Sequence, residues 1–212
     1  LANYHARDGE WAQALPLFAA VARLFPGNPE SFYNLALAQS ETGQIPDAIA
    51  NYRRTIADDP AHARAHHNLA NLLAHDPPAA VPFYRRAIEL RPAFNEARFG
   101  LADSLIAMGD LTAARKTLEE ITASDPAAVP AYISLARLHS QSGDHRTGLA
   151  VLENALRQNP DSGYLAYNAG SFAATLGNRQ RATAHLQQAL RIATSTKDIQ
   201  LRQAAAELLR QL

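Results

Sequence analysis

Four histidines fall within one short stretch of the chain, at positions that invite a metal site: His62, His66, His67 and His75. Imidazole nitrogens are common metal ligands, and histidines four residues apart on a helix share one face. His62 and His66 have that spacing, which also suits a pH-sensitive site. However, His62 is expected in the turn before the helix begins, and His66 occupies a place that holds aromatic residues elsewhere in the chain. We therefore interpret these histidines as packing and surface residues and predict no metal and no cofactor.

The acidic residues and the catalytic motifs we searched for give no stronger evidence of catalysis than the histidines do. Asp58 and Asp59 are adjacent acids, but they fall in an expected turn between helices, and we interpret them as solvated turn residues. The chain lacks a Gly-rich phosphate-binding loop ending in Lys-Ser/Thr, a Gly-x-Ser-x-Gly elbow and a His-Glu-x-x-His motif. It has no cysteine, which excludes disulfides, thiolate zinc sites, iron–sulfur clusters and cysteine nucleophiles. We predict that the chain is not itself an enzyme.

Composition and charge narrow the partner classes. The 212 residues include 20 basic and 20 acidic side chains, and a formal net charge of zero argues against a nucleic-acid partner. No apolar run approaches the roughly 20 residues of a membrane helix, so we predict no direct membrane insertion in this fragment. The 18 arginines against 2 lysines, together with 44 alanines, suggest a GC-rich bacterial genome. Because the chain begins at Leu1, we expect the true N-terminus to be missing, which leaves bacterial periplasm or cytoplasm open as its localisation.

The elements that position these residues are set by an internal repeat. Prolines and glycines each recur with a period of about 34 residues, interrupted only in one shortened unit. They are Pro26, Pro60, Pro92, Pro126 and Pro160, and Gly9, Gly43, Gly109, Gly143 and Gly177. Each unit has two stretches with helical spacing of apolar residues, and the glycine lies between them. We therefore predict a single repeat domain over residues 1–212, with a partial repeat (1–28), repeats 29–62, 63–94, 95–128, 129–162 and 163–196, and a capping helix 197–212.

Small and large residues recur at fixed places within each unit. Counting from the first residue of a unit, the eighth place holds Ala36, Ala70, Ala102, Ala136 and Gly170, and the twentieth place is also always Ala or Gly. Helices approach closely only where the side chains between them are small, so these places predict tight pairing of the two helices. Larger residues at the twenty-fourth place, such as Tyr52 and Tyr84, are expected to fill the neighbouring space.

Caps mark where the helices begin. Asn28 and Pro29 are expected to start one helix, and Asp76 and Pro77 another, in the shortened third unit that lacks the glycine. Thr194 stands where the other units have proline, which predicts a different junction before the last helix.

This pattern resembles the tetratricopeptide repeat (TPR) family. The resemblance rests on Leu35-Ala36, Gly43, Ala48, Tyr52 and Pro60 with their counterparts in each unit, and it extends over essentially the whole chain. It implies an all-α fold, a right-handed α-solenoid of tandem helix-turn-helix repeats, here with a C-terminal capping helix. It also implies a concave groove, lined by the first helix of each pair, that binds a protein or peptide partner.

In that geometry the fifth, sixth and ninth places of each first helix line the groove. The candidate peptide-binding residues are Tyr33, Asn34, Leu37, His67, Asn68, Asn71, Phe99, Asp103, Ile133, Arg137, Tyr167, Asn168 and Ser171. The aromatic and apolar residues at the fifth place would supply contact area for partner side chains. The asparagines at the sixth place would bond both backbone groups of an extended peptide. The alternatives remain open at this point: the rings would pack on the adjacent repeat, and the asparagines would join neighbouring helices.

Two functions are consistent with the sequence. The first is a scaffold for protein–protein interaction that binds an extended segment in the groove. The second is the substrate-recruiting arm of a larger enzyme, for example a glycosyltransferase, whose catalytic domain is absent here. Because the partial first repeat lacks part of a helix, we also expect Trp11, Leu15 and Phe18 to be exposed at the N-terminal edge, where the chain would self-associate unless the intact protein covers them.

Overall fold

Helix and turn signals recur along the chain. The computed structural model describes all of residues 1–212 and contains thirteen α-helices and no strand. The helices are α1 (Ala2–Arg7), α2 (Trp11–Leu24), α3 (Pro29–Glu41), α4 (Ile45–Asp58), α5 (Ala63–Leu72), α6 (Pro77–Leu90), α7 (Asn95–Ala107), α8 (Leu111–Ser124), α9 (Val129–Gln141), α10 (His145–Gln158), α11 (Gly163–Thr175), α12 (Arg179–Ser195) and α13 (Ile199–Gln211). The fold is an all-α solenoid built from helical hairpins.

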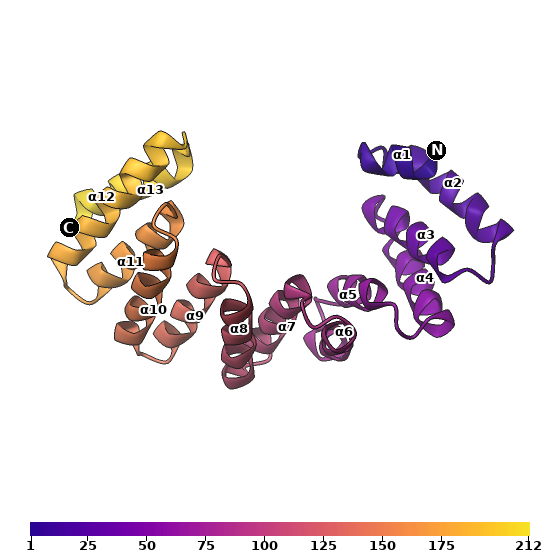
Figure 1. Cartoon of the computed structure of the whole chain (residues 1–212), viewed down its shortest axis with the longest axis horizontal. Helices are drawn as coiled ribbons and strands as arrows, with labels where there is room; N and C mark the ends of the chain where they lie inside the picture. Colours follow the sequence, from indigo (N-terminus) through magenta and orange to yellow (C-terminus); the bar gives the residue numbers. More distant parts are fainter. The chain divides into compact units, whose positions relative to one another are not determined.

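The helices form two compact units, Leu1–Asp110 and Leu111–Leu212. In the first unit, α1, α3, α5 and α7 are the first helices of pairs, and α2, α4 and α6 are second helices. In the second unit, α9 and α11 are first helices, α8, α10 and α12 are second helices, and α13 packs against α11 and α12. Within each unit, consecutive helices lie side by side along the chain (Figure 1).

The expected capping and turn residues set the helix boundaries. Asn28 caps α3 by accepting the Glu30 N–H, and Pro29 is the first residue of that helix. Gly43 adopts φ +78°, a left-handed conformation that residues with a side chain rarely take. This conformation ends α3 before α4 begins. In the shortened unit, Asp76 and Pro77 do start α6, but the Asp76 side chain makes no cap hydrogen bond.

Small residues lie at the helix contacts, as the repeat predicts. Ala36, Ala70, Ala102 and Ala136 are fully buried, and so are the alanines at the twentieth place. Tyr52 and Tyr84 are 1% and 2% exposed and fill the space beside them. Gly100 has a packing reason of its own, because a Cβ there would lie 2.4 Å from the Tyr84 ring.

The two ends of the chain differ from the internal pairs. The short helix α1 packs its Ala2 and Ala6 over Trp11, Leu15 and Phe18. The expectation that these three residues are exposed was therefore wrong: Phe18 is 5% exposed, and the other two are half-buried. At the other end, α12 continues through Thr194, where no proline stops it, and is 17 residues long. None of the thirteen helices combines the length and apolar character needed to cross a bilayer.

Candidate functional site

The candidate residues lie on the first-helix face of each unit. We define this face as the fifth, sixth and ninth places of α3, α5 and α7 in the first unit and, separately, of α9 and α11 in the second unit. Residues spaced i, i+1 and i+4 point to one side of a helix, so each helix contributes one small cluster. Eight of the thirteen candidate residues lie in the first unit and five in the second. Asn71, Asp103 and Arg137 are exposed, Tyr33 is buried, and the other nine are half-buried.

Tyr33 and Asn68 are brought together between consecutive first helices. The side-chain Nδ2 of Asn68 on α5 donates to the hydroxyl oxygen of Tyr33 on α3 at 3.3 Å and to that of Tyr52 on α4 at 3.2 Å. Burial raises the pKa of both tyrosines, because it disfavours the phenolate. Asn68 therefore joins neighbouring helices, and the Tyr33 ring packs on His62 of the next pair, with centroids 4.7 Å apart.

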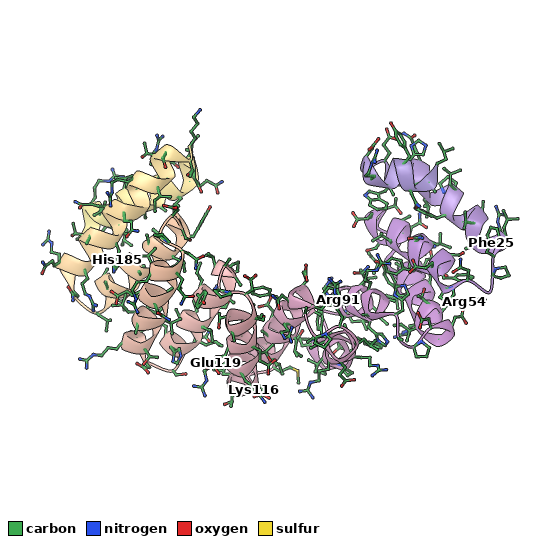
Figure 2. All side chains as sticks on the ribbon, viewed as in Figure 1. Phe25, Arg54, Arg91, Lys116, Glu119 and His185 are labelled. Carbon is green, nitrogen blue, oxygen red and sulfur yellow. The ribbon has the colours of Figure 1, made fainter.

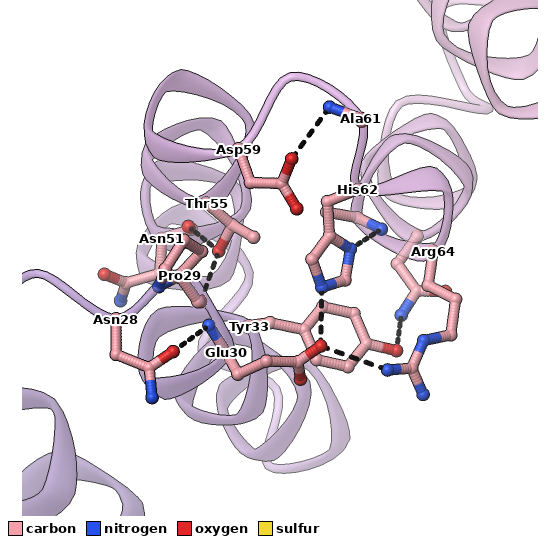
Figure 3. A network of polar contacts seen from close by, with 12 residues as sticks. Asn28, Pro29, Glu30, Tyr33, Asn51, Thr55, Asp59, Ala61, His62 and Arg64 are labelled. Carbon is pink, nitrogen blue, oxygen red and sulfur yellow. Dashed lines mark hydrogen bonds and ion pairs between the residues drawn. The ribbon is translucent and has the colours of Figure 1, made fainter. Parts of the chain in front are cut away.

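A polar network surrounds Tyr33 at the start of α5 (Figure 3). One carboxylate oxygen of Glu30 on α3 lies 3.1 Å from His62 Nε2 and 3.3 Å from Arg64 Nη2. His62 caps α5, because its Nδ1 accepts the Ala65 N–H at 3.0 Å. The neutral His62 ring therefore carries its proton on Nε2 and donates it to Glu30. The Arg64 guanidinium lies over the Tyr33 ring, 4.9 Å from its centroid, and covers it from solvent.

His67 and Asn71 form a second cluster on the same helix. The hydroxyl of Tyr84 donates to Asn71 Oδ1 at 2.7 Å, so the Nδ2 of Asn71 faces His67 Nε2 at 3.1 Å. His67 Nε2 then accepts, and the neutral ring carries its proton on Nδ1, which is buried without a partner. The ring also packs on Phe94, with centroids 4.7 Å apart. Burial lowers the pKa of His67, although nearby Glu96 opposes the shift.

The histidine pair that suggested a metal site is used in packing. His62 directs Nδ1 at the Ala65 N–H, and His66 donates from Nε2 to the carbonyl oxygen of Pro60 at 3.2 Å. His66 is 6% exposed and lies beside Phe83, and its buried Nδ1 has no hydrogen-bond partner. Burial lowers its pKa, because the charged ring would lose its contact with water. No group of three or more His, Cys, Asp or Glu side chains is arranged to hold a metal.

In the second unit the first-helix face is less connected. Ile133 and Tyr167 pack partly against one hydrophobic cluster around Leu165 and Ala169. Asn168 donates from Nδ2 to the carbonyl oxygen of Tyr164 on its own helix at 2.8 Å. Arg137 is exposed and makes no hydrogen bond or ion pair. The five candidates here are therefore not joined to one another by hydrogen bonds.

Several residues that build the first-helix face were not among the candidates. Glu30, His62 and Arg64 belong to the first network, and Tyr84 and Phe94 to the second. A signal for part of this set is present in the sequence, because Tyr52 and Tyr84 share the twenty-fourth place. A tyrosine hydroxyl there reaches across to the asparagines of the first helix, at the sixth place in one case and the ninth in the other.

The helical hairpins, their buried small residues and their glycine turns define a helical repeat protein. The family model of the tetratricopeptide repeat matches residues 5–72, 71–138 and 133–195, and the chain therefore belongs to the tetratricopeptide-repeat family.

Solved structures share this fold, and a curated relative matches the chain in sequence. Across 95% of its length the chain is 28% identical to cellulose synthase operon protein C of Pseudomonas fluorescens (strain SBW25), and it spans 16% of that protein's length. The crystal structure of PilW, a widely conserved type IV pilus biogenesis factor, matches with a TM-score of 0.74 at 17% identity, covering 97% of this chain and 94% of PilW. YrrB, described as a TPR protein with an unusual peptide-binding site, matches with a TM-score of 0.65 at 19% identity, covering 90% of this chain and 97% of YrrB.

Proposed function

We propose that this chain is a protein-interaction module that binds an extended peptide segment on its first-helix face and performs no catalysis itself. The observation that carries the proposal is the pairing of unsatisfied polar groups with half-exposed apolar groups on this face. On α3, Asn34 makes no hydrogen bond within the chain, and Leu37 lies one turn away, half-buried. On α9, Arg137 is exposed one turn from half-buried Ile133. Such a mixture offers a peptide both backbone hydrogen bonds and apolar contact.

Hydrogen bonds within the chain support a division of the candidate residues into supporting residues and proposed contacts. Asn68 and Tyr33 satisfy each other, so we assign them to the support of the face rather than to contact with the partner. The proposed contacts that remain in the first unit are Asn34, Leu37, His67, Asn71, Phe99 and Asp103. Ile133, Arg137, Tyr167, Asn168 and Ser171 remain in the second unit.

Peptide selection tests the proposal and does not require the partner to be identified. A displayed random-peptide library is selected against the chain, and enriched peptides are measured by fluorescence polarisation. The face variant carries Asn34→Ala, Leu37→Ala and Arg137→Ala, and it should bind at least tenfold more weakly. The matched control carries Lys116→Ala, Arg157→Ala and Gln187→Ala, three exposed positions on second helices. Circular dichroism confirms that both variants are folded. Failure to enrich any peptide, or an equal loss in the control, would contradict the proposal.

A second candidate follows from the similarity to cellulose synthase operon protein C. This chain would then be one segment of a much longer protein and would recruit a protein or substrate for a polysaccharide-synthesising enzyme, such as a glycosyltransferase. Co-purification of the full-length protein with such an enzyme, lost in the face variant, would favour this candidate. Co-purification retained in the face variant would place the contact elsewhere.

A further inference from the structure

A hollow on the second-helix side of the second unit contains an arginine that makes no hydrogen bond or ion pair within the chain. It lies between α10, α12 and the turn that joins α11 to α12. Its walls include Arg146, Leu149, Glu153, Leu176, Asn178 and Arg181. None of these residues belongs to the first-helix face.

The acidic side chain in this hollow has ion-pair partners, and one of its arginines has none. Glu153, whose side chain is 17% exposed, lies 3.0 Å from His185 Nε2 through one oxygen and 3.0 Å from Arg181 Nη2 through the other. Figure 2 shows His185 on α12. Arg146 is exposed and makes no hydrogen bond or ion pair within the chain. The one acid in the hollow is thus engaged, while Arg146 and the remaining donors of Arg181 are available.

The local backbone adds to the positive potential. Arg146 is in the first turn of α10 and Arg181 in the first turn of α12, and neither turn contains an acid. Asp144 at the N-cap of α10 accepts the Thr147 N–H and offsets only part of this charge, since Arg146 is one of the groups that lower its pKa. A helix N-terminus is the positive end of the helix dipole, so arginines there do not stabilise the helices. The second unit as a whole has 11 basic and 8 acidic side chains, a net charge of +3. These charges together favour an anionic group in the hollow.

We propose that this hollow binds an acidic side chain of a partner protein, a Glu or Asp followed by an apolar residue. The carboxylate would accept from Arg146 and Arg181, and the apolar neighbour would cover Leu176, which is 36% exposed. Leu149 forms the apolar floor of the hollow and is 3% exposed. The hollow offers only two arginines, whereas a nucleic acid carries a charge at every nucleotide and is bound by a longer run of basic residues. An acidic peptide therefore fits better than a nucleic acid.

An NMR titration tests this site. The probe is an acetylated, amidated hexapeptide that alternates Leu with Glu, and its matched control alternates Leu with Gln. With the Glu peptide, the amide signals of Arg146, Leu176 and Asn178 should shift and saturate at millimolar concentration or below. With the Gln peptide they should not saturate. Shifts confined to the first-helix face would overturn this proposal while leaving the proposed function intact.

A matched pair of variants assigns the effect to Arg146. Arg146→Gln removes no hydrogen bond or ion pair within the chain. It should weaken binding of the Glu peptide about fivefold, the loss of one charge-assisted hydrogen bond in a partly exposed site. Arg157→Gln is the control, because Arg157 lies near the other end of α10 on the same face and contacts only Asn154. An equal loss in both variants would show non-specific attraction and overturn the proposal. Tighter binding of a single-stranded oligouridylate than of the Glu peptide would also overturn it.

Discussion

The side-chain amide of Asn68 lies 3.3 Å from the hydroxyl oxygen of Tyr33, across the contact between two consecutive first helices. Both residues occupy places on the first-helix face, which we propose as the peptide-binding face. Here they bond to each other, and the same amide also reaches Tyr52 at 3.2 Å. A polar residue on this face can therefore join consecutive pairs of helices.

Asn68→Ala is expected to destabilise the fold by about 1–3 kcal/mol, because it leaves two largely buried tyrosine hydroxyls without their donor. Asn34→Ala is the matched control, since Asn34 holds the same place in the preceding repeat but makes no hydrogen bond within the chain. It should change the free energy of unfolding by less than about 0.5 kcal/mol. Urea denaturation followed by circular dichroism measures both. Equal effects would mean that the Asn68 bonds contribute nothing to stability.

Gly100→Ala is expected to destabilise the chain by about 1–3 kcal/mol, because the added Cβ would lie 2.4 Å from the Tyr84 ring. Tyr84 cannot move aside freely, as it is 2% exposed and its hydroxyl is bonded to Asn71. Gly27→Ala is the control, because a Cβ at Gly27 meets no atom within 4 Å. Thermal unfolding compares the two variants, and a Gly100→Ala protein as stable as the Gly27→Ala protein would contradict this packing.

Stability is expected to fall as the pH drops below about 6.5, the usual pKa of histidine. Burial lowers the pKa values of His66 and His67 in the folded chain. The unfolded chain then binds more protons than the folded chain between the lowered and the usual pKa, so acid favours unfolding in that window. At pH values well above the usual pKa, these two residues contribute no pH dependence.

Replacing each histidine by glutamine and measuring unfolding at pH 5 and pH 7 separates their contributions. The difference in the free energy of unfolding between pH 5 and pH 7 should be smaller in His66→Gln and His67→Gln than in the wild-type chain. It should persist in His75→Gln, which removes an exposed histidine. A pH dependence unchanged in all three variants would assign it to other groups.

Self-association through the N-terminal edge remains a prediction, now with different residues. Leu24 and Phe25 at the end of α2 are 72% and 57% exposed, and Tyr4 on α1 is 57% exposed (Figure 2 marks Phe25). We expect light scattering to show association at high concentration, and Leu24→Ser with Phe25→Ser to reduce it. Ile199→Ser, which removes a 59% exposed residue of α13, should not. A wild-type chain that stays monomeric at high concentration would contradict the prediction.

The sequence by itself determined the fold to the level of individual helices. Residues such as Asn28, Gly43 and Ala36 act through local rules of capping, turn geometry and close packing, and these rules need no knowledge of distant contacts. The regular period then repeats the same pair of helices along the chain. For this reason the helical hairpins could be read from spacing alone.

Only the tertiary structure decided what the polar residues of the face do. The spacing places Asn34 and Asn68 alike, yet Asn68 meets two tyrosine hydroxyls and Asn34 meets none. His66 has the spacing of a metal ligand, but its Nε2 is used by the Pro60 carbonyl. Arg146 and Glu153 lie on the same face of α10, and only the packing of α12 shows that Glu153 is engaged and Arg146 is not. A hydrogen bond between two helices is made or lost when their separation changes by a few tenths of an ångström, and a repeat pattern does not encode such small differences.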